Sequence, residues 1–380
     1  MPTFEQGPIR PPSEAHSLLV RVTRNCTWNR CEFCPVYKGE AFSRRSVDEV
    51  ENDIRAMAFW HGEAVSESAR LGFGGRLDSS AALQAVYQRH SDNPYLTAIL
   101  VWQSGGGRTA FLQDANNLVL EPENLAAMLR FLRETFPTIN RVTSYARSST
   151  LAQRTLAELK LVREAGLNRV HVGMESGSDQ ALKLVNKGVT AAKQIEGGRK
   201  AKEAGFELSE YIMPGLGGRA LSEEHAAETA RALSAIDPDF IRVRSLGLRP
   251  GMPLYDRVVR GEFEMMSDEE MARELRATLA GISGVRSMVV SDHVLNLLPE
   301  VEGRLPEDRE KMLAVIDRYL ELPEAERTIY MVGRRMGMME GIDDLGDRRL
   351  RAAAAEAVER LKQVDPDVNA AVRKIAAQFI

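Results

Sequence analysis

Hydrophobic and polar residues are arranged in blocks along most of this chain, and the blocks predict strands that alternate with helices. Short apolar runs have the length of strands. Longer stretches between them carry apolar residues at helical spacing, as at Leu125, Met128, Leu129 and Leu132. Strands that alternate with helices favour a parallel sheet. The predicted strands are residues 18–22, 109–113, 139–145, 168–174, 206–213 and 240–247.

Two helix-to-strand junctions have nearly the same sequence, REAG and KEAG, and each comes directly before a predicted strand. Gly166 and Gly205 end these helices, as expected for a left-handed cap. We therefore predict an α/β fold, a partial (βα)6 TIM-like barrel with parallel strands and a C-terminal helical extension. The predicted parts are an N-terminal arm (1–16), the barrel (17–255) and a mostly helical C-terminal region (256–380).

Residues 63–107 interrupt this pattern, because glycine and serine clusters separate weakly periodic segments. The segment is longer than a connection between a strand and a helix requires. We predict an insertion that contains a strand at 96–102. It is either a surface excursion or a lid or wall of a substrate site.

Composition and charge narrow the function classes. Hydrophobic residues make up 44% and charged residues 27% of the chain, and the net charge is −4. This balance gives no basic field for nucleic acid. The sequence has neither an apolar run of about 18 residues nor a signal-peptide core at its start. We expect a cytoplasmic protein with no membrane partner.

The chain's three cysteines, Cys26, Cys31 and Cys34, lie within nine positions in the spacing C-x4-C-x2-C. Three thiolates on one loop can bind three irons of a cubane cluster and leave the fourth iron open. Thiolates also favour soft metals. The pattern therefore predicts an iron–sulfur site that follows the first strand.

Other uses of the cysteines fit less well. Structural zinc takes four closed ligands, and the nearest histidines in sequence are His16 and His61. A disulfide would leave one cysteine over. Buried free cysteines are common, but three would rarely fall so close together.

The run CTWNRCEFCPVYKG, with Phe33 before the third cysteine, resembles the radical S-adenosylmethionine (radical SAM) superfamily. The usual spacing there is C-x3-C-x2-C. The extra residue matches a sub-branch, distantly related to oxygen-independent coproporphyrinogen oxidase, in which C-x4-C is the rule. The resemblance extends from about residue 17 to residue 335. It implies a [4Fe-4S] cluster and S-adenosylmethionine (SAM) as cofactors, with Phe33 near them.

In a parallel barrel the active site lies at the carboxyl ends of the strands. After the second strand, Asp114 and Asn116 stand where the family has an element that meets the methionine amino group, although shaping the turn is their alternative role. After the third strand, Arg147 suits the methionine carboxylate. Its alternative is a solvated arginine near a helix start.

Glu175 and Ser176 follow the fourth strand and resemble the family's Gly-x-Glu-Ser element, which reaches the ribose and methionine ends of SAM. Glu175 could also serve as a carboxylate at a helix start. Met213 and Gly215 follow the fifth strand. The resemblance places them along the adenine, which glycine allows a backbone to approach closely.

Beyond the barrel, His293 is a candidate proton donor, and Asn296 lies three positions later. A lone histidine is more often a hydrogen-bonded structural residue. Gly333-Arg334-Arg335 could bind an acidic substrate, but we favour an arginine pair in a surface loop.

The resemblance implies a radical SAM enzyme. A reduced cluster cleaves SAM to methionine and a 5′-deoxyadenosyl radical, which abstracts hydrogen from an unidentified small molecule. An electron donor such as flavodoxin or ferredoxin would be the partner. Two alternatives stay open: a radical SAM enzyme that acts on a tetrapyrrole or porphyrinogen, and a non-catalytic haem or cluster carrier.

Overall fold

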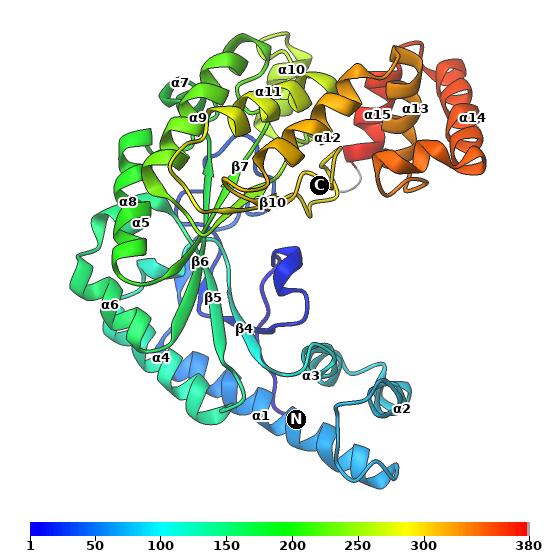
Figure 1. The fold of residues 1–380 in the computed structure, drawn as a ribbon. Coiled ribbons are helices and arrows are strands. Elements are labelled where there is room, and N and C mark those ends of the chain that lie inside the picture. The colour runs from blue at the N-terminus through cyan, green and yellow to red at the C-terminus, as the bar shows by residue number, and fades with distance from the viewer. Residues whose placement is uncertain (378–380) are drawn as a thin grey trace. The chain divides into compact units, whose positions relative to one another are not determined.

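The computed structural model describes residues 1–377 and contains an open, mostly parallel sheet with helices (Figure 1). Its strand order is β1-β4-β5-β6-β7-β8-β9-β10. The pairs β1–β4, β4–β5, β5–β6, β7–β8 and β8–β9 are parallel, and β9–β10 is antiparallel. The predicted partial α/β barrel is therefore confirmed. The strands are β1 (Leu18–Arg21), β4 (Thr109–Gln113), β5 (Arg141–Ala146), β6 (Leu167–Glu175), β7 (Glu207–Ile212), β8 (Phe240–Val243), β9 (Met288–Val290) and β10 (Gly303–Arg304).

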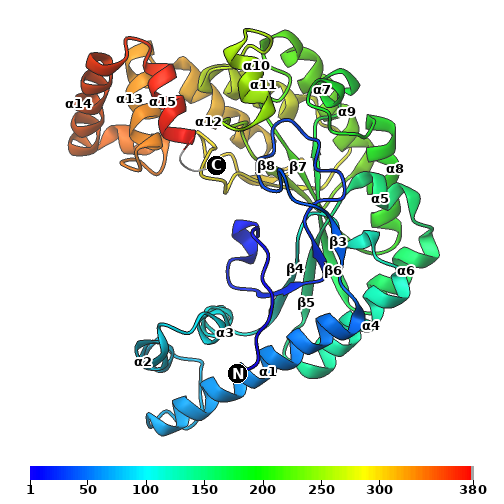
Figure 2. The same ribbon diagram turned by 180° about the vertical axis from the view of Figure 1, so that it is seen from behind.

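The chain divides into two compact units. One comprises residues 1–29, 36–172 and 200–208, and the other comprises 30–35, 173–199 and 209–380. The first unit holds β1, β4 and β5, with α1 packed on α4 and α4 on α6 (Figure 2). Its helices are α1 (Val47–Arg70), α2 (Ser80–His90), α3 (Pro94–Ser104), α4 (Pro122–Thr135), α5 (Ser148–Gln153) and α6 (Leu156–Glu164).

Local signals in the sequence explain the ends of these helices. Ser46 and Glu49 form a capping box at the start of α1. Gly166 and Gly205 have positive φ angles of 120° and 86°, as a left-handed cap requires. Strand β4 is buried along four of its five residues, which is typical of a parallel strand covered on both faces.

The predicted strand at 96–102 is wrong, because this segment is the helix α3. The side chain of Asn93 accepts hydrogen bonds from the backbone N–H groups of the first turn, and Pro94 occupies the first position. Both are signals of a helix start. The apolar run is buried by packing against α1 and β1, so its composition does not distinguish strand from helix. Residues 63–107 are the end of α1 with α2 and α3.

The second unit contains β8, β9 and β10 and most of β7, and its α11 packs on α9 and α12. Strands β9 and β10 extend the sheet beyond the six predicted strands. They have three and two residues, too short to give a periodic signal. Helix α8 (Ala191–Glu203) belongs partly to each unit. The other helices of the second unit are α7 (Asp179–Leu184), α9 (Ser222–Ile236), α10 (Pro253–Val259), α11 (Asp268–Gly281), α12 (Arg309–Glu321), α13 (Glu324–Arg335), α14 (Arg348–Val364) and α15 (Val368–Ala376).

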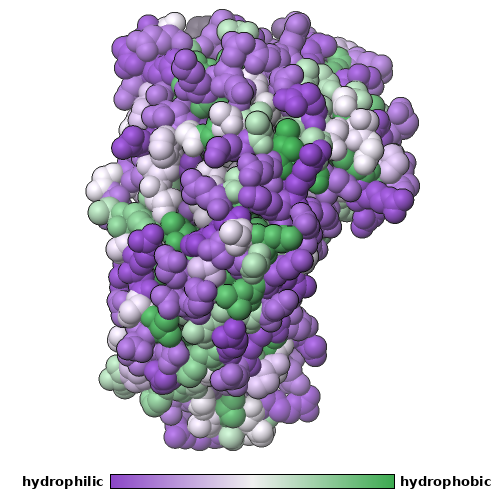
Figure 3. Space-filling model, turned by 90° about the vertical axis from the view of Figure 1, so that its left-hand side faces the viewer, coloured by the Kyte–Doolittle hydropathy of each residue, from purple (hydrophilic) through white to green (hydrophobic). Residues whose placement is uncertain are grey.

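The C-terminal helices α13, α14 and α15 form one group, in which each packs on another (Figure 1). The predicted helical character of the C-terminal region is confirmed for its described part. Within residues 1–377, no helix is both long and apolar enough to span a bilayer. Figure 3 shows a face on which hydrophobic residues lie scattered among hydrophilic ones, as on ordinary protein surfaces.

Candidate functional site

The cysteine loop lies between two short strands that pair with each other. Strands β2 (Thr23–Arg24) and β3 (Ser43–Arg44) form a separate antiparallel sheet, which closes the loop at its two ends. Asn25 and Asn29 have φ angles of 69° and 47°. The Asn29 side chain donates to the carbonyl of Glu40 at 3.1 Å, and the Asn25 side chain donates to that of Ala41 at 2.7 Å. These bonds fix both flanks of the cysteine-bearing segment.

Cys31 is buried, whereas Cys26 and Cys34 are half-buried, and none of the three forms a disulfide. Within residues 1–377, no three His, Cys, Asp or Glu side chains converge as they would around a single metal ion. A cubane cluster takes each thiolate at a different iron, so its ligands need not converge on one point. Three thiolates on a closed loop fit a cluster as a donor set.

The end of β4 holds the predicted residues Asp114 and Asn116. Asp114 is fully buried and accepts hydrogen bonds from Arg21 at 2.6 Å and Tyr37 at 2.7 Å. Asn116 donates to Thr150 at 2.8 Å and accepts from the backbone N–H of Arg147 at 3.1 Å. Both side chains therefore have protein partners, and their predicted contact with SAM stays a prediction.

Arg147 precedes helix α5, as the capping residue of its N-terminus. Its guanidinium lies over the ring of Trp28, 5.4 Å from the centroid. Trp28 belongs to the cysteine loop, so this contact links the end of β5 to that loop. A carboxylate ligand for Arg147 stays a prediction.

The end of β6 carries a group of charged side chains. Glu175 has a φ of 65°, a backbone conformation that a residue with a long side chain rarely adopts and that is common at functional sites. Its carboxylate contacts the ammonium group of Lys187 at 3.0 Å. Lys187 also lies over the ring of Phe33, 5.6 Å from the centroid. Phe33 of the cysteine loop thus contacts Lys187, which pairs with Glu175 at the end of β6.

Glu210 on β7 belongs to the same charged group, and the sequence analysis did not identify it. It is fully buried, and neither carboxylate oxygen has a hydrogen-bond partner within the described residues. Burial, and then the negative charge of Glu175, raise the pKa of Glu210 well above its ordinary value, whereas Lys187 opposes the rise. Its position within a buried strand was the one available signal in the sequence.

The ends of β7 and β9 supply the remaining predicted residues. Met213 and Gly215 lie in the turn after β7, where Gly215 has a φ of 89°. After β9, burial lowers the pKa of His293 to about 4, and the charge of Arg244 adds to this effect. The imidazole is therefore neutral at pH 7, so a role as an acid would require a strong change in its surroundings.

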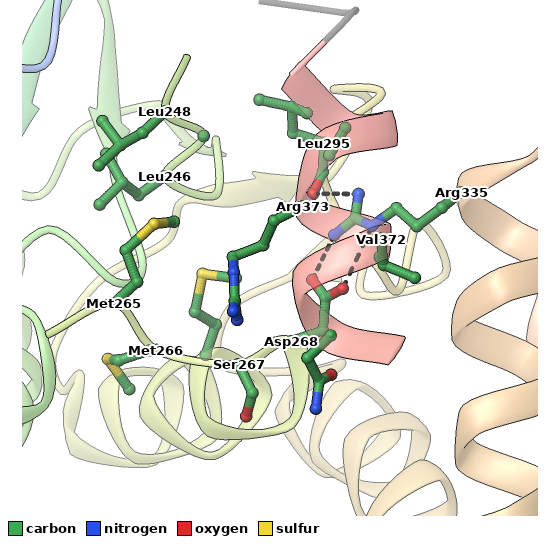
Figure 4. Close-up of a pocket in the computed structure, with 14 residues that line it drawn as sticks. Leu246, Leu248, Met265, Met266, Ser267, Asp268, Leu295, Arg335, Val372 and Arg373 are labelled. Atoms are coloured by element: carbon green, nitrogen blue, oxygen red, sulfur yellow. Dashed lines mark hydrogen bonds and ion pairs between the residues drawn. The ribbon is translucent and has the colours of Figure 1, made fainter. Parts of the chain in front are cut away.

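A small hollow lies in the second unit, beside the segment that follows β8 (Figure 4). Its free volume of about 40 Å³ exceeds the roughly 10–15 Å³ that a cavity needs to hold one water, but is far below the roughly 300 Å³ of a ligand pocket. Arg335 on its wall pairs with Asp268 and donates to the carbonyl of Leu295 at 2.8 Å. Arg335 is thus a structural residue here. The hollow is lined mostly by leucine, methionine and α15 residues, among them Leu246, Leu248, Met265, Met266, Met271, Val372 and Ala376.

Residues 96–231 match the model of the Radical SAM superfamily. The chain contains a radical SAM domain. The matched range runs from α3 to α9 and includes Asp114, Arg147, Glu175 and Glu210. The matched range begins after the cysteine loop, so the match says nothing about that loop. The prediction of a cluster site there depends on the three cysteines.

Two curated proteins share sequence similarity with this chain. Heme chaperone HemW of Bacillus subtilis is 25% identical over 167 residues, which are 43% of this chain and 43% of that protein. A tRNA uridine(34) acetyltransferase of Methanocaldococcus infernus is 25% identical over 114 residues, which are 30% of this chain and 21% of that protein. The chain thus matches less than half the length of either.

Among solved structures, coproporphyrinogen III oxidase (HemN) from Escherichia coli is 17% identical with a TM-score of 0.43, over 70% of this chain and 51% of that one. Radical SAM enzymes use a [4Fe-4S] cluster and SAM and need an electron donor. The match therefore gives this chain the class of radical SAM enzymes and these two cofactors. Its substrate and its reaction are not given by the match.

Proposed function

We propose that Cys26, Cys31 and Cys34 hold a [4Fe-4S] cluster, and that SAM binds beside it at the ends of the parallel strands. The observation that carries this proposal is the cysteine loop: three thiols within nine positions, closed by β2 and β3. With both cofactors bound, reductive cleavage of SAM supplies a 5′-deoxyadenosyl radical for hydrogen abstraction from a substrate. A flavodoxin or ferredoxin would serve as the electron donor.

The charged group of Glu175, Lys187 and Glu210 is suited to hold SAM. Lys187 offers a cation to the methionine carboxylate, and Glu175 offers an acceptor to ribose hydroxyls. Burial, and then the charge of Glu175, raise the pKa of Glu210 well above its ordinary value and so favour its protonated form. A protonated carboxyl can donate one hydrogen bond as well as accept others. An unpartnered buried carboxyl is costly, and a bound ligand would remove that cost.

The other predicted SAM contacts, Asp114, Asn116, Arg147, Ser176, Met213 and Gly215, stay predictions, and they would contribute to the site in different ways. Met213 and Gly215 would act through their backbone along the adenine, whereas Arg147 would act through its guanidinium. The hydroxyl of Ser176 is fully buried and binds the ring of His225. Ser176 would therefore act by shaping the segment that presents Glu175.

The substrate is left open in this proposal. The two curated relatives carry a haem chaperone's name and a tRNA acetyltransferase's name at the same 25% identity, so neither name is transferred. Tetrapyrrole chemistry and a carrier without turnover are the alternatives that a test must separate.

The test is an anaerobic assay of the full chain with reconstituted iron and sulfide, dithionite and SAM. We expect 5′-deoxyadenosine from the wild type, and at least a hundredfold less from Cys31→Ala with loss of the cluster absorption. Val36→Ala, at an exposed position of the same loop, is the control. A cluster that forms without any SAM cleavage would contradict the enzyme, and stoichiometric haem binding would then favour a carrier.

A further inference from the structure

A buried histidine connects the ends of β6 and β7. His225 on α9 is 2% exposed, and its Nδ1 lies 2.7 Å from the Ser176 hydroxyl. Its Nε2 lies 3.2 Å from the carbonyl oxygen of Met213. A carbonyl only accepts hydrogen bonds, so Nε2 carries the hydrogen and Nδ1 accepts from Ser176. These two partners assign one neutral tautomer.

A buried glutamate on α11 binds the turn that follows β7 at Gly215, two residues after Met213. Glu274 is 3% exposed, and its Oε1 accepts from the backbone N–H of Gly215 at 2.7 Å. Its Oε2 accepts from the Ser222 hydroxyl at 2.6 Å, and Oε1 lies 3.5 Å from Nε2 of His225. The two helices thus present adjacent polar side chains to residues 213–215.

The turn itself explains why such support is needed. Gly215 has a φ of 89°, and a Cβ atom there would lie 2.8 Å from the sulfur of Met271. Without Glu274, the N–H of this buried residue would have no acceptor, and an unmade buried hydrogen bond costs free energy. The backbone of Met213 is bound on both sides: its N–H donates to the carbonyl of Glu175 at 2.9 Å, and its carbonyl accepts from His225.

We propose that His225 and Glu274 are positioning residues that hold segments 175–177 and 213–215 in the conformation that binds SAM. This inference rests on the proposed function, because both segments are its SAM contacts. Neither side chain reaches the cofactor in this role. His225 fixes the two segments relative to each other, and Glu274 fixes the backbone of the second.

The charges of the pair support this division of roles. Burial lowers the pKa of His225 to about 4, so the ring is neutral near pH 7 and its tautomer is stable. Burial raises the pKa of Glu274 to about 7, so its charge changes near neutral pH. An ionised acceptor makes the stronger bond to Gly215. The titratable groups that face α11 from other elements are His225 on α9, Arg219 before α9, Asp317 on α12, and Arg327 and Arg335 on α13. The last four pair with Glu270, Arg276, Glu269 and Asp268 of α11, respectively.

The first experiment measures SAM binding to the reconstituted protein by anaerobic calorimetry. Glu274→Ala and His225→Ala should each weaken SAM binding about tenfold, whereas Glu274→Gln should stay within about threefold because its amide oxygen still accepts from Gly215. Glu228→Ala on the exposed face of α9 is the control. Wild-type binding should tighten between pH 6 and pH 8, and that change should be absent from Glu274→Gln.

Two near-isosteric variants separate the two ends of the histidine. His225→Gln can still donate to Met213, and His225→Asn can still accept from Ser176. Amide hydrogen exchange of the SAM-free protein should show faster exchange at 175–178 in the first variant and at 213–218 in the second. This measurement does not depend on activity.

The outcomes distinguish this inference from the proposed function. Folded variants that bind SAM as the wild type does and show unchanged exchange would overturn the positioning roles. A wild-type protein that holds a cluster but binds no SAM would overturn the proposed function. The hydrogen-exchange result would then still show whether His225 connects segments 175–177 and 213–215. If the alanine variants do not fold, the Gln and Asn variants decide the matter.

Discussion

The ends of β4 and β6 each place an acidic residue in left-handed backbone, yet the two carboxylates have different surroundings. Asp114, with a φ of 72°, is fully buried and accepts hydrogen bonds from Arg21 and Tyr37. Glu175, with a φ of 65°, pairs with Lys187 and feels the charge of Glu210, whose oxygens have no hydrogen-bond partner in the described residues.

The difference indicates at which strand end the protein alone supplies hydrogen-bond partners for the buried polar groups. Buried polar groups in proteins are almost always hydrogen-bonded, and the surroundings of Asp114 meet this rule without any ligand. The surroundings of Glu175 do not, because they contain an unpartnered carboxyl group. We infer that the acid at β4 mainly stabilises the protein, whereas the acids at β6 and β7 mainly bind a ligand.

The largest expected effect tests the β4 side of this comparison. Asp114→Ala should lower the free energy of unfolding by about 3 kcal/mol, because it removes a fully buried carboxylate that pairs with the half-buried Arg21 guanidinium. Denaturant unfolding measures the loss. Asp78→Ala, which removes an exposed carboxylate paired with Arg76, should leave the free energy unchanged. An Asp114→Ala protein as stable as the wild type that no longer binds SAM would reverse the assignment.

The second effect concerns the β6 side. Glu175→Gln should weaken SAM binding by about thirtyfold, equivalent to about 2 kcal/mol, because the amide cannot balance the charge of Lys187 beside the ligand. Calorimetry on the reconstituted protein measures the change. Glu207→Gln removes a carboxylate on β7 that pairs with Arg169 and serves as the control. Equal affinities in the two variants would contradict the role of Glu175.

The contrast also shows what the sequence can reveal. The parallel strands, the glycine caps and the cysteine loop follow from local patterns, and the structure has the strands and caps where they were expected. The hydrogen-bond partners of Asp114 cannot be predicted from local patterns, because Arg21 and Tyr37 are 93 and 77 residues away in sequence. A sequence motif shows that an acidic residue follows a strand. Whether the protein itself supplies hydrogen-bond partners for that carboxylate depends on tertiary packing.

The same limit applies to the residues that were missed. Lys187 and Glu210 are 12 and 35 residues from Glu175 and come together only when β6 and β7 are adjacent. Helix α3 was mistaken for a strand because a short apolar run fits both. The Asn93-Pro94 start was the deciding signal.

The third prediction separates affinity from stability at Glu210. Glu210→Leu should weaken SAM binding about tenfold and yet raise the free energy of unfolding at pH 8 by about 1 kcal/mol. The sign follows from the raised pKa, because stability from this group is present below its ordinary pKa of 4.5 and is lost as the pH rises through the folded value. Unfolding at pH 5 and pH 8 measures the effect. A loss of stability at pH 8 would mean that the carboxyl is satisfied in the SAM-free protein.

The smallest expected effect concerns His293, beyond both strand ends. Burial lowers its pKa from 6.5 to about 4, so between these values the unfolded chain binds a proton that the folded protein does not. Stability from this group is therefore present above pH 6.5 and is lost as the pH falls toward 4. His293→Gln should remove that loss and gain about 1 kcal/mol on the wild type between pH 7 and pH 5, with His90→Gln as the control. If the two variants showed the same pH dependence, His293 would be open enough to take up a proton, and its candidacy as a proton donor would gain support.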